Sequence, residues 1–329
     1  MRRLIHVAWL LVAAQLAAAP FAEPLAAPLA APLATQSATS ALRVDQVAPG
    51  VYVHIGQHKD FEEGYDGDIA NIGFVVGSDA VAVIDTGGSY AVGMALKIAL
   101  RAVTRLPIRY VINTHGHPDH VFGNAAFIEA DSAAGEERPR FIGHATLPRF
   151  LALRGDAYER NLKQQLGAAA ASRLVAPGET VQDRLTLDLG GRKLELKAWP
   201  NAHTDNDLTV FDTASGTLWT GDLLFIERTP AIDGDLQGWL AAMDALDKVP
   251  AGITIPGHGP VTRDRKAALA RQRHYLTTLL HDVRTGIRQG ADMPATMATA
   301  AASERGRWQL FDIVNRRNVN LLYPRLEWE

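Results

Sequence analysis

Hydrophobic positions along the chain fall into short apolar runs that alternate with turns and with longer helical patterns. Apolar residues at helical spacing predict a helix over residues 90–103, and two short runs flanking Gly77-Ser78-Asp79 predict a hairpin. The first series of strands is expected at 51–55, 72–76, 80–84 and 108–112, followed by helical segments at 122–129, 147–153 and 156–174.

A second series of the same kind follows, with a hairpin predicted around Gly190-Gly191. Its strands are expected at 185–189, 193–198, 208–211, 217–220 and 253–255, and its helices at 236–248 and 266–289. Two similar series of strands and helices predict an α/β fold in which two β-sheets pack together with helices outside. We therefore expect a four-layer αββα sandwich of two mixed β-sheets.

The N-terminus has the pattern of an export signal. Arg2 and Arg3 precede an apolar run over residues 4–19, and small residues around 17–22 offer cleavage positions, which predicts a signal peptide over 1–22. An uncleaved membrane anchor is the alternative, although the run is short for a membrane span. The general secretory and twin-arginine routes both stay open.

Repeated Pro-Leu-Ala-Ala over residues 23–41 predicts a flexible tether, so one folded domain is expected over 42–329. The sequence contains no cysteine, which excludes disulfides, cysteine nucleophiles and thiolate metal sites. Any bound metal must therefore have nitrogen and oxygen ligands. The formal net charge of −3 provides no broad basic surface for a nucleic-acid partner.

The densest cluster of reactive side chains is His115-Gly116-His117-Pro118-Asp119-His120, shortly after the predicted strand at 108–112. Imidazole and carboxylate are the ligands that zinc uses where no thiolate is present. Spacings of one and two residues on a tight turn allow these side chains to converge, and Gly116 and Pro118 shape the backbone. The cluster therefore predicts a metal site.

Distant residues must complete the site, because one loop cannot surround two metal ions. His203, Asp222 and His258 each follow a predicted strand, where α/β folds commonly place functional groups. Taken singly, the two histidines could be hydrogen-bonded loop residues and Asp222 a turn residue. Together with the first cluster they form a full set of metal ligands.

These motifs, in this order, resemble the metallo-β-lactamase superfamily, and Asp85-Thr86-Gly87 resembles its first motif. The resemblance covers nearly all of residues 46–329 and implies a hydrolase that uses a hydroxide bridging two metal ions. Zinc is the expected metal, while iron and manganese also accept such ligands. By similarity, His115, His117 and His203 would bind the first metal, Asp119, His120 and His258 the second, and Asp222 would bridge both.

Two aspartates receive further roles from this resemblance. Asp119 is the expected catalytic residue, since it would orient the hydroxide and pass a proton to the leaving group. Asp85 is expected to support the metal-binding loop by accepting a ring N–H from a ligand histidine. That role is compatible with Asp-Thr-Gly forming a turn.

The ligand set also indicates a branch of the superfamily. The absence of cysteine excludes the cysteine-type β-lactamases, and a bridging Asp222 resembles the glyoxalase II-like hydrolases. The stretches 68–73, 205–207, 228–240 and 326–329 resemble the quinoprotein relay system zinc metallohydrolases, which are similar to SoxH-like proteins, although Ala202 stands where that branch usually has glycine. This resemblance implies a periplasmic enzyme with a functional link to a quinoprotein dehydrogenase or sulfur-oxidation system.

The expected substrate is a small molecule containing an ester, thioester, lactone or amide bond. Two alternatives stay open: a metal-dependent periplasmic binding protein without turnover, and a β-lactamase. No membrane span is expected after removal of the signal peptide. The natural substrate and the oligomeric state are not indicated by the sequence.

Overall fold

The computed structural model describes residues 40–60, 65–128, 137–167 and 173–329. The predicted signal peptide over 1–22 and nearly all of the tether over 23–41 lie outside the described residues. Contacts within the chain group Thr39–Glu329 into one unit. No helix in the described part of the chain is long and apolar enough to cross a membrane.

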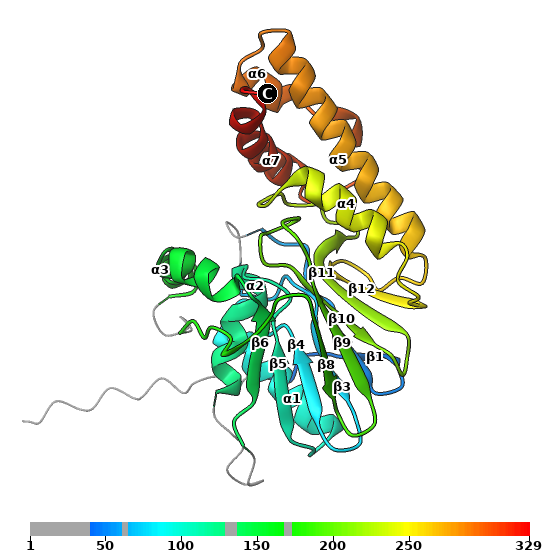
Figure 1. Ribbon diagram of the computed structural model, residues 1–329. Coiled ribbons are helices and arrows are strands. Elements are labelled where there is room, and N and C mark those ends of the chain that lie inside the picture. The colour runs from blue at the N-terminus through cyan, green and yellow to red at the C-terminus, as the bar shows by residue number, and fades with distance from the viewer. Residues whose placement is uncertain (1–39, 61–64, 129–136, 168–172) are drawn as a thin grey trace, which may run out of the picture. The chain divides into compact units, whose positions relative to one another are not determined.

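The first sheet has seven strands that lie side by side in chain order (Figure 1). Neighbouring strands run antiparallel from β1 to β4 and parallel from β4 to β7. Apolar residues fill β3 and β4, which are buried almost throughout, as expected for strands covered on both faces. The strands are β1 (Asp45–Ala48), β2 (Val51–His54), β3 (Ile72–Val76), β4 (Val81–Ile84), β5 (Ile108–Ile112), β6 (Arg140–His144) and β7 (Glu179–Val181).

The second sheet has five strands in the order β12-β11-β10-β9-β8, and only β11 and β12 are parallel to each other. In β9 exposed charged residues alternate with Leu194 and Leu196, which are buried against the first sheet. Gly190 and Gly191 both have positive φ, which the tight hairpin before β9 requires. The strands are β8 (Arg184–Asp188), β9 (Lys193–Ala198), β10 (Leu208–Asp212), β11 (Thr217–Phe225) and β12 (Ile253–His258).

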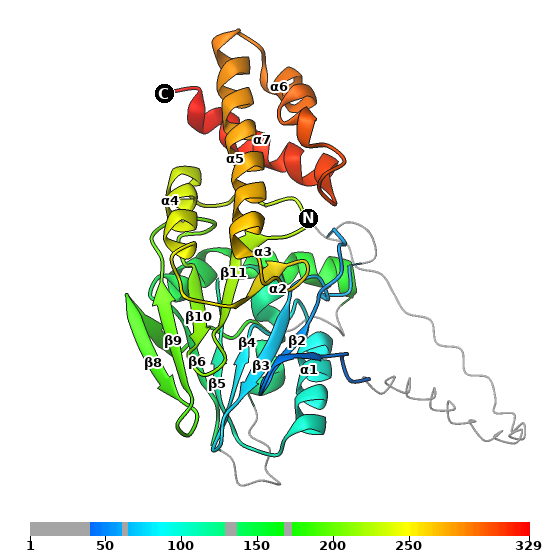
Figure 2. The same cartoon turned by 90° about the vertical axis from the view of Figure 1, so that its right-hand side faces the viewer.

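Helices pack on the sides of the two sheets that face away from each other. α1 begins after Ser89, whose side chain accepts a hydrogen bond from Val92 N, and it buries Leu96 and Leu100 against the first sheet. α4 and α5 pack against β11 of the second sheet (Figures 1 and 2). The helices are α1 (Tyr90–Val103), α2 (Pro118–Val121), η1 (Phe122–Phe127), α3 (Leu147–Leu166), α4 (Leu236–Leu246), α5 (Arg265–Arg288), α6 (Met293–Thr299), η3 (Ala302–Glu304) and α7 (Phe311–Leu326).

The predicted αββα sandwich of two mixed sheets is confirmed, although some elements differ from the prediction. The two helices expected at 147–153 and 156–174 form one helix, α3, because packing offsets the roughly 1 kcal/mol cost of Gly155 inside a helix. This helix ends at Leu166, and residues 168–172 of the expected range lie outside the described residues. The segment expected to be helical at 122–129 is the short 3-10 helix η1. The strands expected at 217–220 and 253–255 continue to Phe225 and His258.

Candidate metal centre

The loop after β5 carries the densest group of histidines and is held by buried side chains. Asn113 Nδ2 donates to the carbonyl of His120 at 3.2 Å, and Gly116 N donates to Asn206 Oδ1 at 2.8 Å. A Cβ at Gly116 would collide with Phe150 of α3, so glycine allows the helix to pack directly on this loop. The loop is thus fixed from both sheets and from α3.

The structure brings the seven predicted ligands together in two adjoining groups. In the first group, His117 Nδ1 lies 3.1 Å from both His115 Nε2 and His203 Nε2. In the second group, Asp119 Oδ2 lies 3.3 Å from His258 Nε2 and 3.6 Å from His120 Nε2. The first group consists of His115, His117, His203 and Asp222, and the second of Asp119, His120 and His258, with ligand atoms within 4.8 Å of one another in each group.

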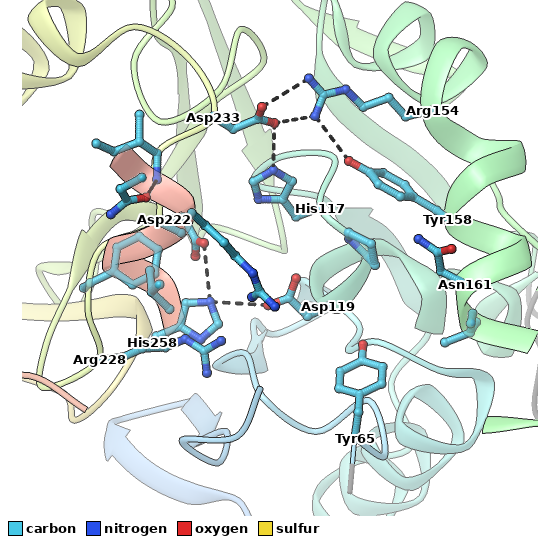
Figure 3. Close-up of a pocket in the computed structure, with 18 of the residues that line it drawn as sticks. Tyr65, His117, Asp119, Arg154, Tyr158, Asn161, Asp222, Arg228, Asp233 and His258 are labelled. Atoms are coloured by element: carbon cyan, nitrogen blue, oxygen red, sulfur yellow. Dashed lines mark hydrogen bonds and ion pairs between the residues drawn. The ribbon is translucent and has the colours of Figure 1, made fainter. Parts of the chain in front are cut away.

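Asp222 lies between the two groups. Its Oδ2 is 3.4 Å from His203 Nε2 in the first group and 3.3 Å from His258 Nε2 in the second. Its Oδ1 is 3.2 Å from His120 Nε2. One carboxylate therefore faces ligand nitrogens of both groups, and Figure 3 shows its contact with His258.

Every histidine in the two groups has its outer ring nitrogen in contact with a hydrogen-bond acceptor. Because an acceptor fixes the ring N–H on that side, the inner nitrogen presents a lone pair to the centre. The contacts are His115 Nδ1 to Thr114 Oγ1 (3.1 Å), His117 Nε2 to Asp233 Oδ2 (3.0 Å), His203 Nδ1 to the Ala231 carbonyl (2.8 Å), His120 Nδ1 to Asp85 Oδ2 (2.8 Å) and His258 Nδ1 to the Ile69 carbonyl (2.8 Å).

Asp85 supports the metal-binding loop from the end of β4. Besides the contact with His120, its carboxylate accepts hydrogen bonds from Thr114 N at 2.8 Å and Thr114 Oγ1 at 2.7 Å. Asp85 has φ of 52°, a left-handed conformation that is unfavourable for a residue other than glycine. The three hydrogen bonds hold this conformation and connect the end of β4 to both ligand groups.

The donor atoms fit metal ions. His120 Nε2 and Asp222 Oδ1 are buried and lie 3.2 Å apart, but neither atom makes a hydrogen bond among the described residues. Buried polar atoms are rarely left without a partner, so their inward direction indicates a ligand at the centre. Nitrogen and carboxylate oxygen donors without sulfur suit zinc, iron or manganese.

Burial and mutual charge set the protonation of the groups. Burial lowers the pKa of His203 to about 4, and burial together with the neighbouring His120 lowers the pKa of His115 well below its usual range. Burial would raise the pKa values of Asp119 and Asp222, but the facing histidines outweigh it and hold both values below the usual range. His115 and His203 therefore offer neutral imidazoles, and both aspartates are ionised.

A cavity of about 440 Å³ opens over the two groups (Figure 3). His117, Asp119, Asp222 and His258 form its floor. One wall is the inner face of α3, and the opposite walls come from the segment after β11 and from α7. The other lining residues are Tyr65, Pro118, Arg154, Tyr158, Asn161, Leu162, Gln165, Phe225, Arg228, Ala231, Ile232, Asp233, Val314, Arg317 and Asn318.

Two residues of the site were not predicted as functional. Asp233 contacts His117, and Arg154 contacts Asp233 across 79 positions of sequence. Asp233 falls in the stretch 228–240 used for the resemblance, but a lone aspartate before glycine also has the pattern of a turn residue. Only its contacts with His117 and Arg154 in the folded chain distinguish Asp233 from an ordinary turn residue.

Comparison with known proteins places these observations in a family. A model described as "Metallo-beta-lactamase superfamily" matches residues 65–258, which is more than half of the chain. A linear primary-alkylsulfatase from Pseudomonas sp. is 23% identical over 237 residues, covering 62% of this chain and 44% of that protein. The chain thus spans less than half of the length of this relative.

Solved structures show the same fold. The stereoselective inverting sec-alkylsulfatase of Pseudomonas sp. matches with a TM-score of 0.64 at 18% identity, covering 86% of this chain and 50% of that chain. The metallo-β-lactamase of Pontibacter korlensis matches with a TM-score of 0.53 at 20% identity, covering 72% of this chain and 99% of that one. Since the matched family range contains both ligand groups from His115 to His258, the chain belongs to the metallo-β-lactamase superfamily and is a metal-dependent hydrolase.

Proposed function

We propose that this hydrolase is a periplasmic enzyme with two zinc ions that cleaves an ester-type bond in a small molecule. The observation that carries the proposal is Asp222, whose carboxylate faces ligand nitrogens of both groups. His115, His117 and His203 would hold one zinc, Asp119, His120 and His258 the other, and Asp222 both. When bound, a zinc pair lowers the pKa of a water molecule and polarises the bond to be cleaved.

Asp119 is the residue that we assign to proton transfer. Its carboxylate lies on the floor of the cavity and is ionised, because the facing His120 and His258 outweigh burial and lower its pKa. An ionised carboxylate at this position can accept a proton from water and pass it to the leaving atom. Asp85 keeps His120 oriented during this transfer.

The cavity walls suit a substrate that is largely apolar and carries an anionic or strongly polar group. Leu162, Phe225 and Ile232 supply apolar surface. Arg228 lines the cavity, is 5% exposed and donates from Nη1 to the Lys59 carbonyl at 2.7 Å. Among the described residues it interacts with Asp119 and Asp222 through charge, without a hydrogen bond to either carboxylate. We place carboxylic esters, thioesters, lactones and amides first among the substrate classes.

Sulfate esters are the second candidate class. The buried guanidinium of Arg228 would suit a sulfate group, and two of the relatives are named as alkylsulfatases. Because the chain spans only about half of these proteins, their activity is a proposal here.

The proposed cellular setting rests on the N-terminal sequence and on the resemblance to the quinoprotein relay system metallohydrolases. Cleavage of a signal peptide over 1–22 would release the domain over 42–329 into the periplasm on a short tether. Mass spectrometry of the N-terminus of the mature protein from a periplasmic fraction tests the export. Export would support a functional link to a quinoprotein dehydrogenase or sulfur-oxidation system, which a deletion strain tests by its growth on the corresponding substrate.

Turnover is tested with the full chain loaded with zinc and a panel of p-nitrophenyl acetate, a thioester, a lactone, a primary alkyl sulfate and nitrocefin. We expect two zinc ions per chain and turnover of at least one ester-type substrate, with little or none of nitrocefin. The variant Asp119→Ala should lose turnover and the second zinc. A chain that binds two zinc ions, binds small molecules and turns over none of the panel would instead support a binding protein, and an Asp119→Ala variant with full activity would remove the mechanism.

A further inference from the structure

In each ligand group, one histidine is held by a carboxylate and the others by neutral oxygens. In the second group this histidine is His120, held by Asp85. In the first group it is His117, held by Asp233. Asp85 belongs to the first motif of the superfamily resemblance, whereas Asp233 belongs to none of the ligand motifs.

His117 is the least buried histidine of the first group, so its ring gains most from a hydrogen bond that fixes its orientation. Its side chain is 19% exposed, whereas the side chains of His115 and His203 are almost fully buried. Because His117 borders the open cavity, fewer packed neighbours restrain its ring. The contact of Nε2 with Asp233 Oδ2 at 3.0 Å keeps the ring N–H on the outer side and turns Nδ1 towards the centre (Figure 3).

Asp233 is itself held by Arg154 of α3. Arg154 Nη1 donates to Asp233 Oδ2 at 2.5 Å and Nη2 donates to Oδ1 at 3.2 Å, which is the paired geometry of a guanidinium on a carboxylate. The guanidinium lies 4.4 Å from the ring centroid of Phe150, one turn earlier in α3. These contacts fix both the position and the plane of the Asp233 carboxylate.

The segment around Asp233 also holds a second ligand of the same group. The Ala231 carbonyl accepts a hydrogen bond from His203 Nδ1 at 2.8 Å. Helix α7, which lies beyond the matched family range of 65–258, also holds this segment. Asn318 Oδ1 accepts a hydrogen bond from Ile232 N at 2.9 Å, and Arg325 Nη1 donates to the Gly234 carbonyl at 2.6 Å. The segment is therefore fixed from α3 and α7 on opposite sides.

We propose that Asp233 is a positioning residue for the first metal site, which it serves by orienting His117, and that Arg154 keeps its carboxylate in place. This inference rests on the proposed function in that it takes His115, His117, His203 and Asp222 to bind a metal. Loss of an outer carboxylate of this kind costs about 10- to 100-fold in metal affinity, because the ligand ring loses orientation and basicity. The affinity of the second site should stay unchanged.

The test measures the two zinc dissociation constants of the full chain by chelator competition, in the wild type and in Asp233→Asn. We expect the constant of one site to weaken by about 10- to 100-fold and that of the other to keep its value. The cobalt-substituted protein gives a readout independent of activity, because the visible absorption of the first site should change in Asp233→Asn. Arg154→Met should produce a smaller effect in the same direction, and Arg154→Lys should recover part of it.

The matched control is Asp60→Asn. Asp60 forms the same paired contact with Arg317, at 2.7 and 3.0 Å, and Asp60 belongs to neither ligand group and does not line the cavity. This variant should keep both zinc constants, while thermal unfolding of all variants shows that they are folded. The proposal is overturned if Asp233→Asn leaves both constants unchanged or weakens them equally. A wild type that binds no zinc in the first group would overturn the proposed two-metal function as well, so the wild-type and variant measurements separate the two failures.

Discussion

The absence of a Cβ at Gly257 allows Asp222 to lie between the two ligand groups. A Cβ at Gly257 would overlap Asp222 Oδ1 and also crowd backbone atoms of Gly221 and Asp222, which cannot move aside as the end of a flexible side chain can. Glycine is therefore required in Gly257-His258-Gly259 for a reason separate from backbone flexibility. The nearby Gly252 differs, because a Cβ there would meet nothing within 4 Å.

We predict that Gly257→Ala displaces the Asp222 carboxylate and lowers kcat/KM by about 100-fold or more, because a misplacement of about 1 Å in an active site has an effect of that size. The zinc content should fall below that of the wild type. Metal analysis and steady-state kinetics measure both effects. Gly252→Ala is the control and should behave as the wild type; equal zinc content and activity in Gly257→Ala would contradict the packing argument.

A second residue-scale prediction concerns His54 and Asp68, whose side chains lie 2.6 Å apart. Burial lowers the pKa of His54, but the hydrogen bond and charge of Asp68 outweigh it and raise the value above 6.5, and the same contact lowers the pKa of Asp68 below 3.8. Because the pKa of His54 is raised, its protonated form stabilises the fold fully below about pH 6.5. Because the pKa of Asp68 is lowered, its ionised form does so above about pH 3.8. The contact therefore contributes most between these pH values.

The variant His54→Gln should lose most stability near pH 5 and progressively less as the pH rises through the pKa of folded His54. Urea unfolding of the wild type and the variant at pH 5 and pH 9 measures the difference. Asp68→Asn should abolish the same pH dependence. A stability difference that is equal at both pH values would show that the pair acts through packing rather than charge.

Which residues could be predicted from the sequence depends on how much of their role is local. His115 to His120 could be predicted because ligand residues and the turn residues that bring them together lie within one loop. Asp233 could not, because its role depends on His117 and on Arg154, which come from other elements. The long-range contacts, and not the residue type, are the basis of its proposed role.

At the scale of elements, β11 shows why strand ends were predicted less well than strand positions. From the sequence, the glycine at position 221 predicts that the strand ends at Thr220, and in the structure Gly221 has φ of 51°. The strand instead continues with a shift of register, since Gly221 pairs with Pro256 and Phe225 with His258 of β12. Asp222 therefore lies within a strand, on a bulge that turns its side chain to the centre, and not in a loop after it.

Helix α7 offers a prediction at the same scale. Asn318 Nδ2 donates to the Pro230 carbonyl and to Tyr275 Oη, both at 2.8 Å, and Oδ1 accepts from Ile232 N. Asn318→Ala should lower the free energy of unfolding by about 1–3 kcal/mol, because buried polar groups lose their partners. Urea denaturation measures this value. Asn320→Ala, on the exposed side of the same helix, is the control and should change it by less than about 0.5 kcal/mol.

At the scale of the whole molecule, the two series of strands and helices predict the four-layer arrangement, because short apolar runs are a reliable indication of buried strands. The last forty residues gave no such signal. α7 begins after Leu310, which has a left-handed conformation and provides no side-chain cap, and the helix contains Pro324. Its position is set by contacts with α5 and α6 rather than by local pattern.

Removal of the metal should affect the stability of the whole domain, since buried histidines and aspartates from both sheets meet at the centre. Metal that binds the native state alone stabilises it by about 4 kcal/mol at 1,000 times the dissociation constant. Dialysis against a chelator should therefore lower the Tm by several degrees, and added zinc should restore it. Calorimetry measures both steps; an unchanged Tm would indicate that the centre is held by protein contacts alone.

Trp239 lies beside His203 of the first ligand group, so its fluorescence can report metal binding at that site. The indole is fully buried, is held by a hydrogen bond from Nε1 to the Leu223 carbonyl at 3.0 Å, and lies with its ring centroid 5.1 Å from that of His203. No other tryptophan in the described part of the chain has a ring contact with a ligand histidine. Filling of the first site with a paramagnetic ion such as Co²⁺ should quench the fluorescence of Trp239, so a titration of the unlabelled protein can follow one site of the pair, and Trp239→Phe identifies the signal.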